Sequence, residues 1–136
     1  MYFGKEFFRV GSFNPLIDLI LDVKTIFSPY FSSRHVWIAE EDDTIVIKIV
    51  LPGFKREHID VRANEKEIYI KAEKNVEDEF EEQYWRRYIK DGKIRIKGKI
   101  PTPIVIEPES GKAKMDAGIL TIKFKRKEKA QKVSVD

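Results

Sequence analysis

The sequence contains no cysteine and only two histidines, His35 and His58, in 136 residues. Without cysteine, a chain has no disulfide framework, no thiolate nucleophile and no cysteine-ligated zinc or iron–sulfur site. Neither histidine lies in a catalytic motif, and the acids at 40–43 are contiguous rather than spaced as in an EF-hand loop, which favours a solvated turn. The chain also lacks a glycine-rich phosphate loop. We therefore expect a protein that is not an enzyme and that uses no cofactor, no metal and no ATP.

Long apolar runs are absent as well, because no stretch approaches the roughly 20 residues that span a bilayer. The N-terminus lacks the features of a secretory signal, so we expect a cytosolic protein that requires no membrane. The 26 basic and 23 acidic residues are interleaved, and a net charge of +3 gives little long-range attraction for nucleic acid or anionic lipid. Glutamine and asparagine are rare while lysine, glutamate and isoleucine are abundant, which supports the hypothesis of a thermophilic source.

Aromatic residues concentrate at the N-terminus. The chain has 9 Phe, 5 Tyr and 2 Trp, and eight of these aromatic residues lie in the first 31 positions. Asn14 and Pro15 predict the start of a helix, whose apolar residues recur at helical spacing as far as Phe27, and Pro29 ends it. The apolar stripe is wider than one docking surface needs. The sequence therefore predicts a hydrophobic, helical N-terminal arm over residues 1–34, with a core helix as the alternative.

From residue 36 onward, apolar residues recur with a period of two instead of 3.6. This alternation is typical of strands that have one face in a core and one in water. The alternating apolar positions include Ile45, Ile47, Ile49, Leu51, Ile59, Val61, Ala63, Ile68, Ile70, Ala72, Ile94, Ile96, Leu120, Ile122 and Phe124. Short strands, turn signals such as Asp91-Gly92 and the lack of a second helical segment predict an all-β fold, an immunoglobulin-like β-sandwich over residues 35–125.

Two segments do not fit inside a closed sandwich. The insert at 75–92 carries acids followed by aromatic and basic residues, and it is too long for a hairpin turn. The segment 126–136 begins with a largely basic stretch without apolar periodicity, so we expect an extended C-terminal tail. This tail ends in Val133-Ser134-Val135.

The most specific motif is the stretch Ala-Lys-Met-Asp-Ala-Gly-Ile-Leu at 113–120. It matches the A-x-x-x-n-G-v-L signature of the α-crystallin domain, with Ala117 in place of the usual Asn, and Leu-Pro-Gly-Phe at 51–54 matches a second family motif. The chain thus resembles the small heat shock proteins, of the archaeal or bacterial type, over its whole layout of arm, sandwich and tail. The residues that carry the signature are Ala113, Gly118, Leu120, Pro52 and Gly53. In physical terms, Gly118 supplies the positive φ of a tight turn and Leu120 begins the inward face of the next strand.

The sequence departs from the family pattern on the strand that ends at Pro101. Family members often carry an Arg five residues before this proline and an aromatic three before it, where this chain has Ile96 and Gly98. Arg95 is one position out of register and would face the other side of the strand. An ion pair between subunits that depends on that Arg is therefore not carried over.

The resemblance implies that the chain forms homodimers through the insert. By resemblance to non-animal members of the family, the insert would project as an arm whose strand near 84–89 pairs with the sheet of a second subunit. The expected dimer residues are Tyr84, Trp85, Arg87 and Ile89. The alternative is a long hairpin that folds on its own domain.

The tail offers a second contact between copies, because Val133-Ser134-Val135 resembles the I-x-I tail motif of the family. In an extended tail Val133 and Val135 point to the same side about 7 Å apart and can enter two apolar pockets on another subunit. Burial of two valines stabilises by only a few kcal/mol, so each contact is reversible while symmetry makes the larger homo-oligomer strong. The alternative is a frayed terminus.

As a small heat shock protein, the chain would be an ATP-independent holdase chaperone that binds partly unfolded proteins under heat stress and suppresses their aggregation. Unfolding proteins share exposed apolar surface and little else, so the arm is the expected client-binding region. Its expected contacts are Phe3, Phe7, Phe8, Phe13, Leu16, Ile17, Ile20 and Phe27. A CS-domain co-chaperone shares the sandwich but has little use for such an arm or for the aliphatic tail pair.

The main alternative from another class is a nucleic-acid-binding β-domain. Every second residue of the strand 93–99 is basic, and such a stripe could follow a phosphate backbone. Stacking aromatics are missing from that face, and the acids at 77–82 lie nearby in the sequence. We therefore expect no nucleic-acid partner.

Overall fold

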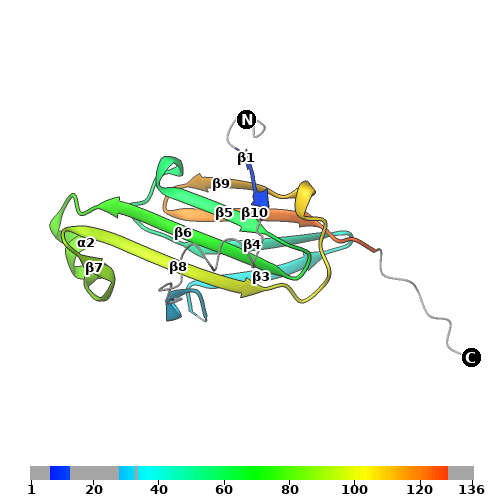
Figure 1. Ribbon diagram of the computed structural model, residues 1–136, viewed down its shortest axis with the longest axis horizontal. Helices are drawn as coiled ribbons and strands as arrows, with labels where there is room; N and C mark the ends of the chain where they lie inside the picture. Colours follow the sequence, from blue (N-terminus) through cyan, green and yellow to red (C-terminus); the bar gives the residue numbers. More distant parts are fainter. Residues whose placement is uncertain (1–6, 13–27, 33, 129–136) are drawn as a thin grey trace, which may run out of the picture.

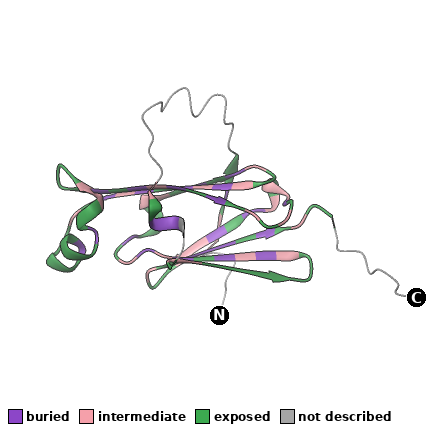
Figure 2. Cartoon of the chain, turned by 90° about the horizontal axis from the view of Figure 1, so that it is seen from below, coloured by how far each residue is buried: buried purple, intermediate pink, exposed green. Residues whose placement is uncertain are grey.

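The computed structural model describes residues 7–12, 28–32 and 34–128, which form two β-sheets packed face to face. Figure 1 shows the strands from one face, and Figure 2 shows the two layers from the side. Strands make up most of the described chain, and its helices are short. The expected all-β sandwich is confirmed.

The first sheet has five strands in the order β1-β9-β10-β4-β3, and all neighbours run antiparallel. Its strands are β1 (Phe8–Arg9), β3 (Val36–Glu41), β4 (Thr44–Val50), β9 (Lys112–Asp116) and β10 (Ile119–Lys125). The second sheet has the order β2-β5-β6-β8-β7, in which only β2 and β5 run parallel. Its strands are β2 (Gly11–Ser12), β5 (Ile59–Ala63), β6 (Glu67–Asn75), β7 (Ile89–Lys90) and β8 (Lys93–Pro101).

In the described part of the chain, five short helices connect or flank these strands. They are η2 (Pro29–Ser32), η3 (Arg56–His58), α2 (Glu79–Tyr84), η4 (Arg86–Tyr88) and η5 (Pro108–Ser110). α2 and β7 lie at one end of the molecule, and the described chain ends at the other (Figure 1). None of the helices in the described residues is long and apolar enough to cross a membrane.

The core lies between the sheets and follows the period of two in the sequence. In β4, Ile45, Ile47 and Ile49 are fully buried while Lys48 between them is exposed. Inward positions are buried in the same alternating way along β6 and β8 (Figure 2). The expected inward positions therefore make one continuous apolar layer, and apolar burial of this kind is the main stabilising term of a small domain.

The turn between β9 and β10 carries the signature motif. Ala117 and Gly118 have φ angles of 50° and 77°, as the two central residues of a type I′ hairpin turn require. The expectation that Gly118 supplies a positive φ is confirmed, whereas a side chain at 117 in this conformation costs about 1 kcal/mol. The acids at 40–43 end β3 and form the exposed turn to β4, which confirms the interpretation of a solvated turn.

The N-terminal arm differs from the expectation in its described parts. Residues 7–12 contain two short strands, and residues 28–32 contain the 3-10 helix η2, whose Tyr30 and Phe31 are buried in the core. The helix expected between Asn14 and Phe27 falls at 13–27, outside the described residues. A helical arm is thus not supported, and the core begins earlier in the chain than the expected boundary at residue 34.

The insert at 75–92 also differs from the expectation. The strand predicted over 84–89 is wrong, because the chain forms α2 to residue 84, then the turn of η4, and returns to extended backbone only in β7. The physical reason is local: Asp78 accepts a hydrogen bond from the backbone N–H of Glu81 at 2.7 Å and thereby caps a helix rich in acids at its first turn. β7 then pairs with β8 as a hairpin within the same chain.

Candidate functional site

Aromatic side chains from three separate parts of the chain meet around Trp85. Tyr30 comes from η2, Phe54 from the loop after β4, and Trp85 from the insert. The ring centroids of Tyr30 and Trp85 are 4.8 Å apart, and those of Phe54 and Trp85 are 5.4 Å apart. We call this group the aromatic cluster; its members are Tyr30, Phe31, Phe54, Tyr84, Trp85 and Tyr88. Because Trp85 is fully buried, the cluster joins the arm and the insert to the core.

Tyr30 is the polar centre of the aromatic cluster. Its hydroxyl donates a hydrogen bond to the carbonyl oxygen of Val50 and lies 2.9 Å from the hydroxyl of Tyr84. Its ring stacks on His35, with 3.9 Å between centroids. Burial, and after it the hydrogen bond with Tyr84, raises the pKa of Tyr30 well above its usual 10.0. The phenol therefore stays protonated and holds η2 against β4.

Phe31 fills the space above Gly98 in β8. A Cβ atom at position 98 would lie 1.8 Å from the ring of Phe31, which no real pair of atoms tolerates. Nearby, the backbone N–H of Ser28 donates to the carbonyl oxygen of Lys97 at 2.6 Å. Position 98 is where the family pattern usually has an aromatic residue, so here an aromatic ring from the arm covers the strand instead.

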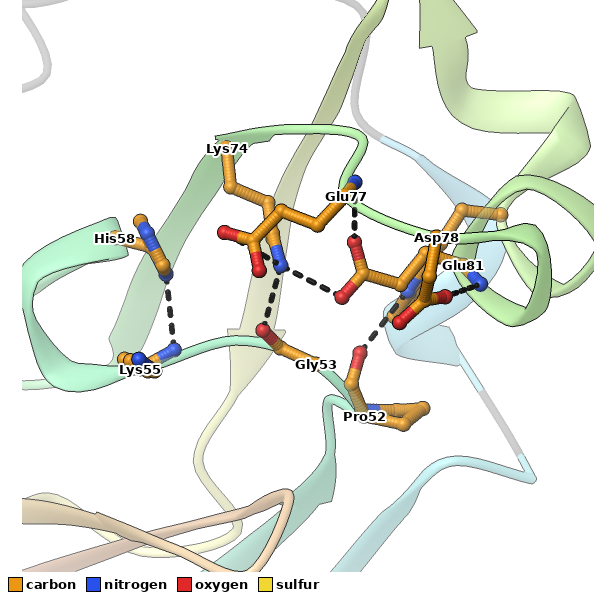
Figure 3. Close-up of polar contacts among 9 residues, drawn as sticks. Pro52, Gly53, Lys55, His58, Lys74, Glu77, Asp78 and Glu81 are labelled. Carbon is orange, nitrogen blue, oxygen red and sulfur yellow. Dashed lines mark hydrogen bonds and ion pairs between the residues drawn. The ribbon is translucent and has the colours of Figure 1, made fainter.

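A buried ion pair fixes the insert to the loop after β4 (Figure 3). Lys74 Nζ lies 2.7 Å from Glu81 Oε2 and donates to the carbonyl oxygen of Gly53 at 2.8 Å. The side chains of Lys74 and Glu81 are only 1% and 5% exposed. The second carboxylate oxygen of Glu81 accepts from the backbone N–H of Glu77 at 3.1 Å. Because hydrogen bonds satisfy both charges, the pair is tolerated in the interior, where a lone charge would be strongly destabilising.

The two sequence motifs of the family lie side by side at this loop. The indole N–H of Trp85 donates to the carbonyl oxygen of Pro52 at 3.1 Å, and the N–H of Leu51 donates to that of Gly118 at 2.7 Å. A Cβ at Gly118 would lie 3.4 Å from the Cα atom of Pro52. The motif residues thus build the contact between the β9–β10 turn and the loop that receives the insert.

The predicted dimer residues lie in three different elements of the insert. Tyr84 ends α2 and is exposed, Trp85 is buried in the aromatic cluster, Arg87 is exposed in η4, and Ile89 is half-buried in β7. Within this chain the insert folds on its own domain, as the alternative expectation had it. An exchange of the insert between subunits stays a prediction.

Two of the eight predicted client-binding residues lie in the described part of the chain. The ring of Phe7 lies beneath the ammonium groups of Lys114 and Lys123, at 5.5 and 5.6 Å from its centroid. Phe8 packs against the core, with the guanidinium of Arg56 at 5.0 Å from its ring centroid. The residues Phe3, Phe13, Leu16, Ile17, Ile20, Phe27, Val133 and Val135 lie outside the described residues.

The largest apolar exposure on a strand is at the edge of the first sheet. β3 is its terminal strand, and among the described residues no strand pairs with its outer side. Trp37 and Ile38 on β3 are 56% and 41% exposed. Phe80 on α2 is exposed as well and stacks on Tyr84, with 5.7 Å between ring centroids. Open strand edges with apolar side chains recruit other extended segments.

The basic stripe on β8 is largely paired with acids of the neighbouring strand. Arg95 binds Glu73 through two hydrogen bonds of 3.1 and 3.3 Å, and Lys99 Nζ lies 3.1 Å from Glu67. The hydrogen bond from Arg95 lowers the pKa of Glu73, so this carboxylate is charged at neutral pH. Such pairing weakens the attraction for a phosphate backbone. The expectation that Arg95 faces away from Ile96 is confirmed, because Ile96 is fully buried.

The histidines have structural partners in this fold. His58 Nδ1 accepts a hydrogen bond from the backbone N–H of Lys55 at 2.9 Å, and His35 stacks on Tyr30. Within the described residues, no group of three or more His, Asp or Glu side chains could hold a metal ion.

The family model described as Hsp20/alpha crystallin family matches residues 37–136. The chain belongs to this family. An 18.5 kDa class I heat shock protein of Glycine max is 31% identical over 103 residues, which are 74% of this chain and 62% of that protein, so the chain spans less than two thirds of this relative.

Solved structures of Hsp20 proteins share the fold. Heat shock protein 16.0 from Schizosaccharomyces pombe has a TM-score of 0.55 at 20% identity and covers 92% of this chain and 95% of its own. A small heat-shock protein from Xylella fastidiosa has a TM-score of 0.53 at 20% identity, and the match covers 74% of this chain and 92% of that one. The relatives include plant, fungal and bacterial proteins, so they do not single out the archaeal or bacterial type. Membership in this family is consistent with the expectation of a chaperone.

Sequence reasoning missed several residues of the site. Lys74 and Glu81 stand in runs of charged residues typical of exposed surfaces, and only the fold brings them together in the interior. Tyr30 and Phe31 follow an apolar helical pattern, which predicts that they belong to the arm and not to the core. A signal was available for Phe31, since Gly98 stands where the family has an aromatic and leaves a space that another ring must fill.

Proposed function

We propose that this protein is an ATP-independent holdase chaperone that binds partly unfolded proteins under heat stress and works as an oligomer built from dimers. One observation carries the proposal: an Hsp20 sandwich presents Trp37 and Ile38 on an edge strand that nothing in the described chain covers. Apolar surface on an open edge favours association with other chains.

Clients bind mainly to the aromatic arm. Its apolar side chains recognise any exposed apolar surface without reading a sequence, so the protein competes with aggregation and uses no nucleotide. Binding of this kind is passive, and refolding is left to other proteins.

Dimers form along the open edge of β3, and the tails link dimers into larger particles. The exposed Trp37 and Ile38 lie where a strand from a second copy would add to the sheet. Val133 and Val135 dock on another copy through a weak contact that symmetry multiplies.

The test measures the light scattering of a heat-denatured enzyme with increasing amounts of the protein and without nucleotide. The intact chain delays aggregation, whereas a Phe3→Ser/Phe13→Ser/Phe27→Ser variant loses most of the protection because its arm loses apolar area. The matched control, Asp18→Ser/Asp22→Ser, changes polar positions of the same arm and retains the protection. A wild-type chain that never delays aggregation overturns the proposal.

The oligomer is tested by light scattering coupled to size exclusion. The variant Val133→Ala/Val135→Ala falls to dimers, and the further change Trp37→Glu places a charge on the β3 edge and gives monomers. A large particle that persists in the tail variant contradicts the proposed role of the tail.

A further inference from the structure

The open edge of β3 has an uncharged centre between ends of opposite charge. The residues of this centre are Val36, Trp37, Ile38 and Ala39, and all but the first are exposed. Natural edge strands are often protected by lysine, proline or a bulge, whereas this centre has no lysine or proline and pairs with β4 without a bulge. Arg34 precedes the strand, and the acids at 40–43 follow its centre. The edge is therefore open to a further strand.

The register of β3 on β4 shows which backbone groups of the edge point outward. The carbonyl oxygen of His35 accepts a hydrogen bond from the backbone N–H of Val50 at 3.0 Å, and the pairing continues without a break to the end of β3. Hydrogen-bonded pairs alternate along an antiparallel ladder, so the odd-numbered residues of β3 bond to β4. The backbone N–H and C=O groups of Val36, Ile38 and Glu40 therefore point away from β4, toward the open side.

The insert of a second copy offers no free strand for this edge. Most of the insert is taken up by α2 and η4, Trp85 is fully buried in the aromatic cluster, and Glu81 pairs with Lys74 in the interior. Its extended part, β7, contains two residues and already pairs with β8. A longer strand with an open side is present in β3 itself, and every copy of the chain carries it.

We propose that two copies of the chain pair along β3, antiparallel and about a two-fold axis at Ile38. The inference rests on the dimer of the proposed function and names the strand and the register that form it. In this register Ile38 is opposite the partner's Ile38, and Val36 is opposite the partner's Glu40. The outward residues of the two copies then form about six backbone hydrogen bonds, two for each opposed pair. A shift by two residues in either direction keeps only part of these pairs.

Side chains on both faces of the paired strands fit this register. Trp37, which is 56% exposed in the single chain, lies opposite the partner's Ala39, whose small side chain leaves room for the indole ring. On the other face, the two Ile38 side chains meet at the axis, beside a hollow that Ile38 lines together with Glu40 and residues 101–103. The pairing thus buries apolar side chains that a single copy leaves exposed.

The charges at the ends of β3 favour the antiparallel direction. In this direction Arg34 of each copy reaches the acidic end of the other, at residues 40–43. A parallel pair would place the acids of the two copies beside each other, and opposed like charges are destabilising. Because the two-fold axis repeats every contact, each favourable pair of charges occurs twice in the dimer.

The absence of cysteine permits a test of the register with single cysteines in the Val133→Ala/Val135→Ala background. Ile38→Cys brings two thiols together at the axis, where opposed Cα atoms are about 5.5 Å apart, so oxidation links most chains into dimers. Val36→Cys and Glu40→Cys are the matched controls. Neither links to its own kind, because the two equal positions lie roughly 14 Å apart along the strands. An equal mixture of these two variants links, since the two positions are opposed. Non-reducing electrophoresis and intact mass measure the products.

A second test reverses charges at the ends of the strand. In the same background, sedimentation equilibrium shows that Arg34→Glu and Glu41→Lys each raise the dissociation constant of the dimer at least about fivefold, because like charges then meet twice. The double variant Arg34→Glu/Glu41→Lys returns to within about twofold of the unchanged chain, since the ends are again complementary. Glu57→Lys, an equal change of charge in η3, is the control and stays within about twofold of the unchanged chain.

The outcomes separate this pairing from the proposed function. Absence of the Ile38→Cys self-link, or a link between Ile38→Cys and Glu40→Cys chains in its place, overturns the proposal. Failure of the double charge variant to recover the dimer also contradicts the antiparallel direction. If the chain without the self-link is still a dimer and delays aggregation, the proposed function stands without this pairing. A self-linked Ile38→Cys dimer together with a wild-type chain that never delays aggregation overturns the proposed function instead.

Discussion

Two pieces of the same N-terminal arm contribute to the fold in opposite ways. Residues 28–32 place Tyr30 and Phe31 inside the sandwich, where their rings contact the aromatic cluster and cover Gly98. Residues 8–12 lie across the sheet edges through two strands of two residues each. The first piece lies inside the core, and the second adds Val10 at its edge through short strand pairings. Proximity along the chain therefore does not decide which part of an arm is structural.

The difference follows from what each piece contacts. Tyr30 reaches the insert through Tyr84 and the first sheet through Val50, so its removal disturbs three elements at once. Val10 lies beside Gly111 at the outer edge of the core, so we expect its loss to disturb fewer contacts. The predictions below test this contrast, and all are made in the Val133→Ala/Val135→Ala background so that assembly does not contribute to the unfolding free energy.

The largest expected effect is on Phe31. Phe31→Ala lowers the free energy of unfolding by about 3 to 5 kcal/mol, because a large ring is replaced by a cavity over Gly98. Val10→Ala, the matched change in residues 8–12, lowers it by only about 1 kcal/mol. Urea unfolding followed by tryptophan fluorescence measures both. Likewise, deletion of residues 1–12 leaves the fold intact, whereas deletion of residues 1–31 does not. Equal losses of unfolding free energy in Phe31→Ala and Val10→Ala would contradict the contrast between the two pieces.

The next effect tests whether the insert holds residues 28–32 in place. Glu81→Ala removes the nearer and buried acid from the ammonium of Lys74, which keeps only the exposed carboxylate of Glu77 at 3.6 Å, and lowers the free energy of unfolding by about 3 kcal/mol. Amide hydrogen exchange then increases at residues 28–32, which share the aromatic cluster with the insert, and stays unchanged at residues 8–12. Glu82→Ala, an exposed neighbour, serves as the control. Equal acceleration of amide hydrogen exchange at residues 8–12 and 28–32 would contradict this coupling.

A smaller effect compares two glycines, Gly98 beneath residues 28–32 and Gly11 within residues 8–12. Gly98→Ala forces a Cβ against the ring of Phe31 and lowers the free energy of unfolding by about 1 to 3 kcal/mol. Gly11→Ala is tolerated, because its Cβ would lie at ordinary contact distances, 3.4 Å from the flexible side chain of Arg62 and 3.7 Å from the carbonyl oxygen of Val61. A Phe31→Leu change relieves part of the Gly98→Ala penalty, and the double-mutant cycle measures this coupling. Strict additivity would show that the two residues do not compete for the same space.

The smallest effect concerns the hydroxyl of Tyr30. Tyr30→Phe removes its hydrogen bonds and lowers the free energy of unfolding by about 1 kcal/mol at neutral pH. Because folding raises the pKa of Tyr30, the unfolded chain loses the phenolic proton above pH 10.0 while the folded chain retains it, so stability falls as pH rises further. The Tyr30→Phe variant lacks this part of the loss of stability at alkaline pH. Urea titrations between neutral pH and about pH 11 measure it, and parallel pH profiles for the two chains would contradict the role of Tyr30.

Much of the fold followed from sequence patterns that depend only on neighbouring residues. The alternation of Ile45, Ile47 and Ile49 predicts a half-buried strand because side chains of a strand point to opposite faces. Gly118 predicts a tight turn because glycine adopts a positive φ without steric cost. The same local reasoning failed for the insert: its aromatic residues suggested a strand, but the cap at Asp78 starts a helix there.

The sequence alone determined that this protein is a cysteine-free β-sandwich with the Hsp20 signature, because strand period, turn residues and composition act over a few positions. Only the tertiary structure decided that Tyr30 joins the core, that Lys74 pairs with Glu81, and that residues 8–12 pair with the edges of β9 and β5. Each of these contacts joins parts of the chain that are separated in the sequence, and local sequence patterns do not show that these parts meet. Packing and hydrogen bonding in the folded state bring them together, since a buried charge must find a partner, and a space over a glycine must be filled.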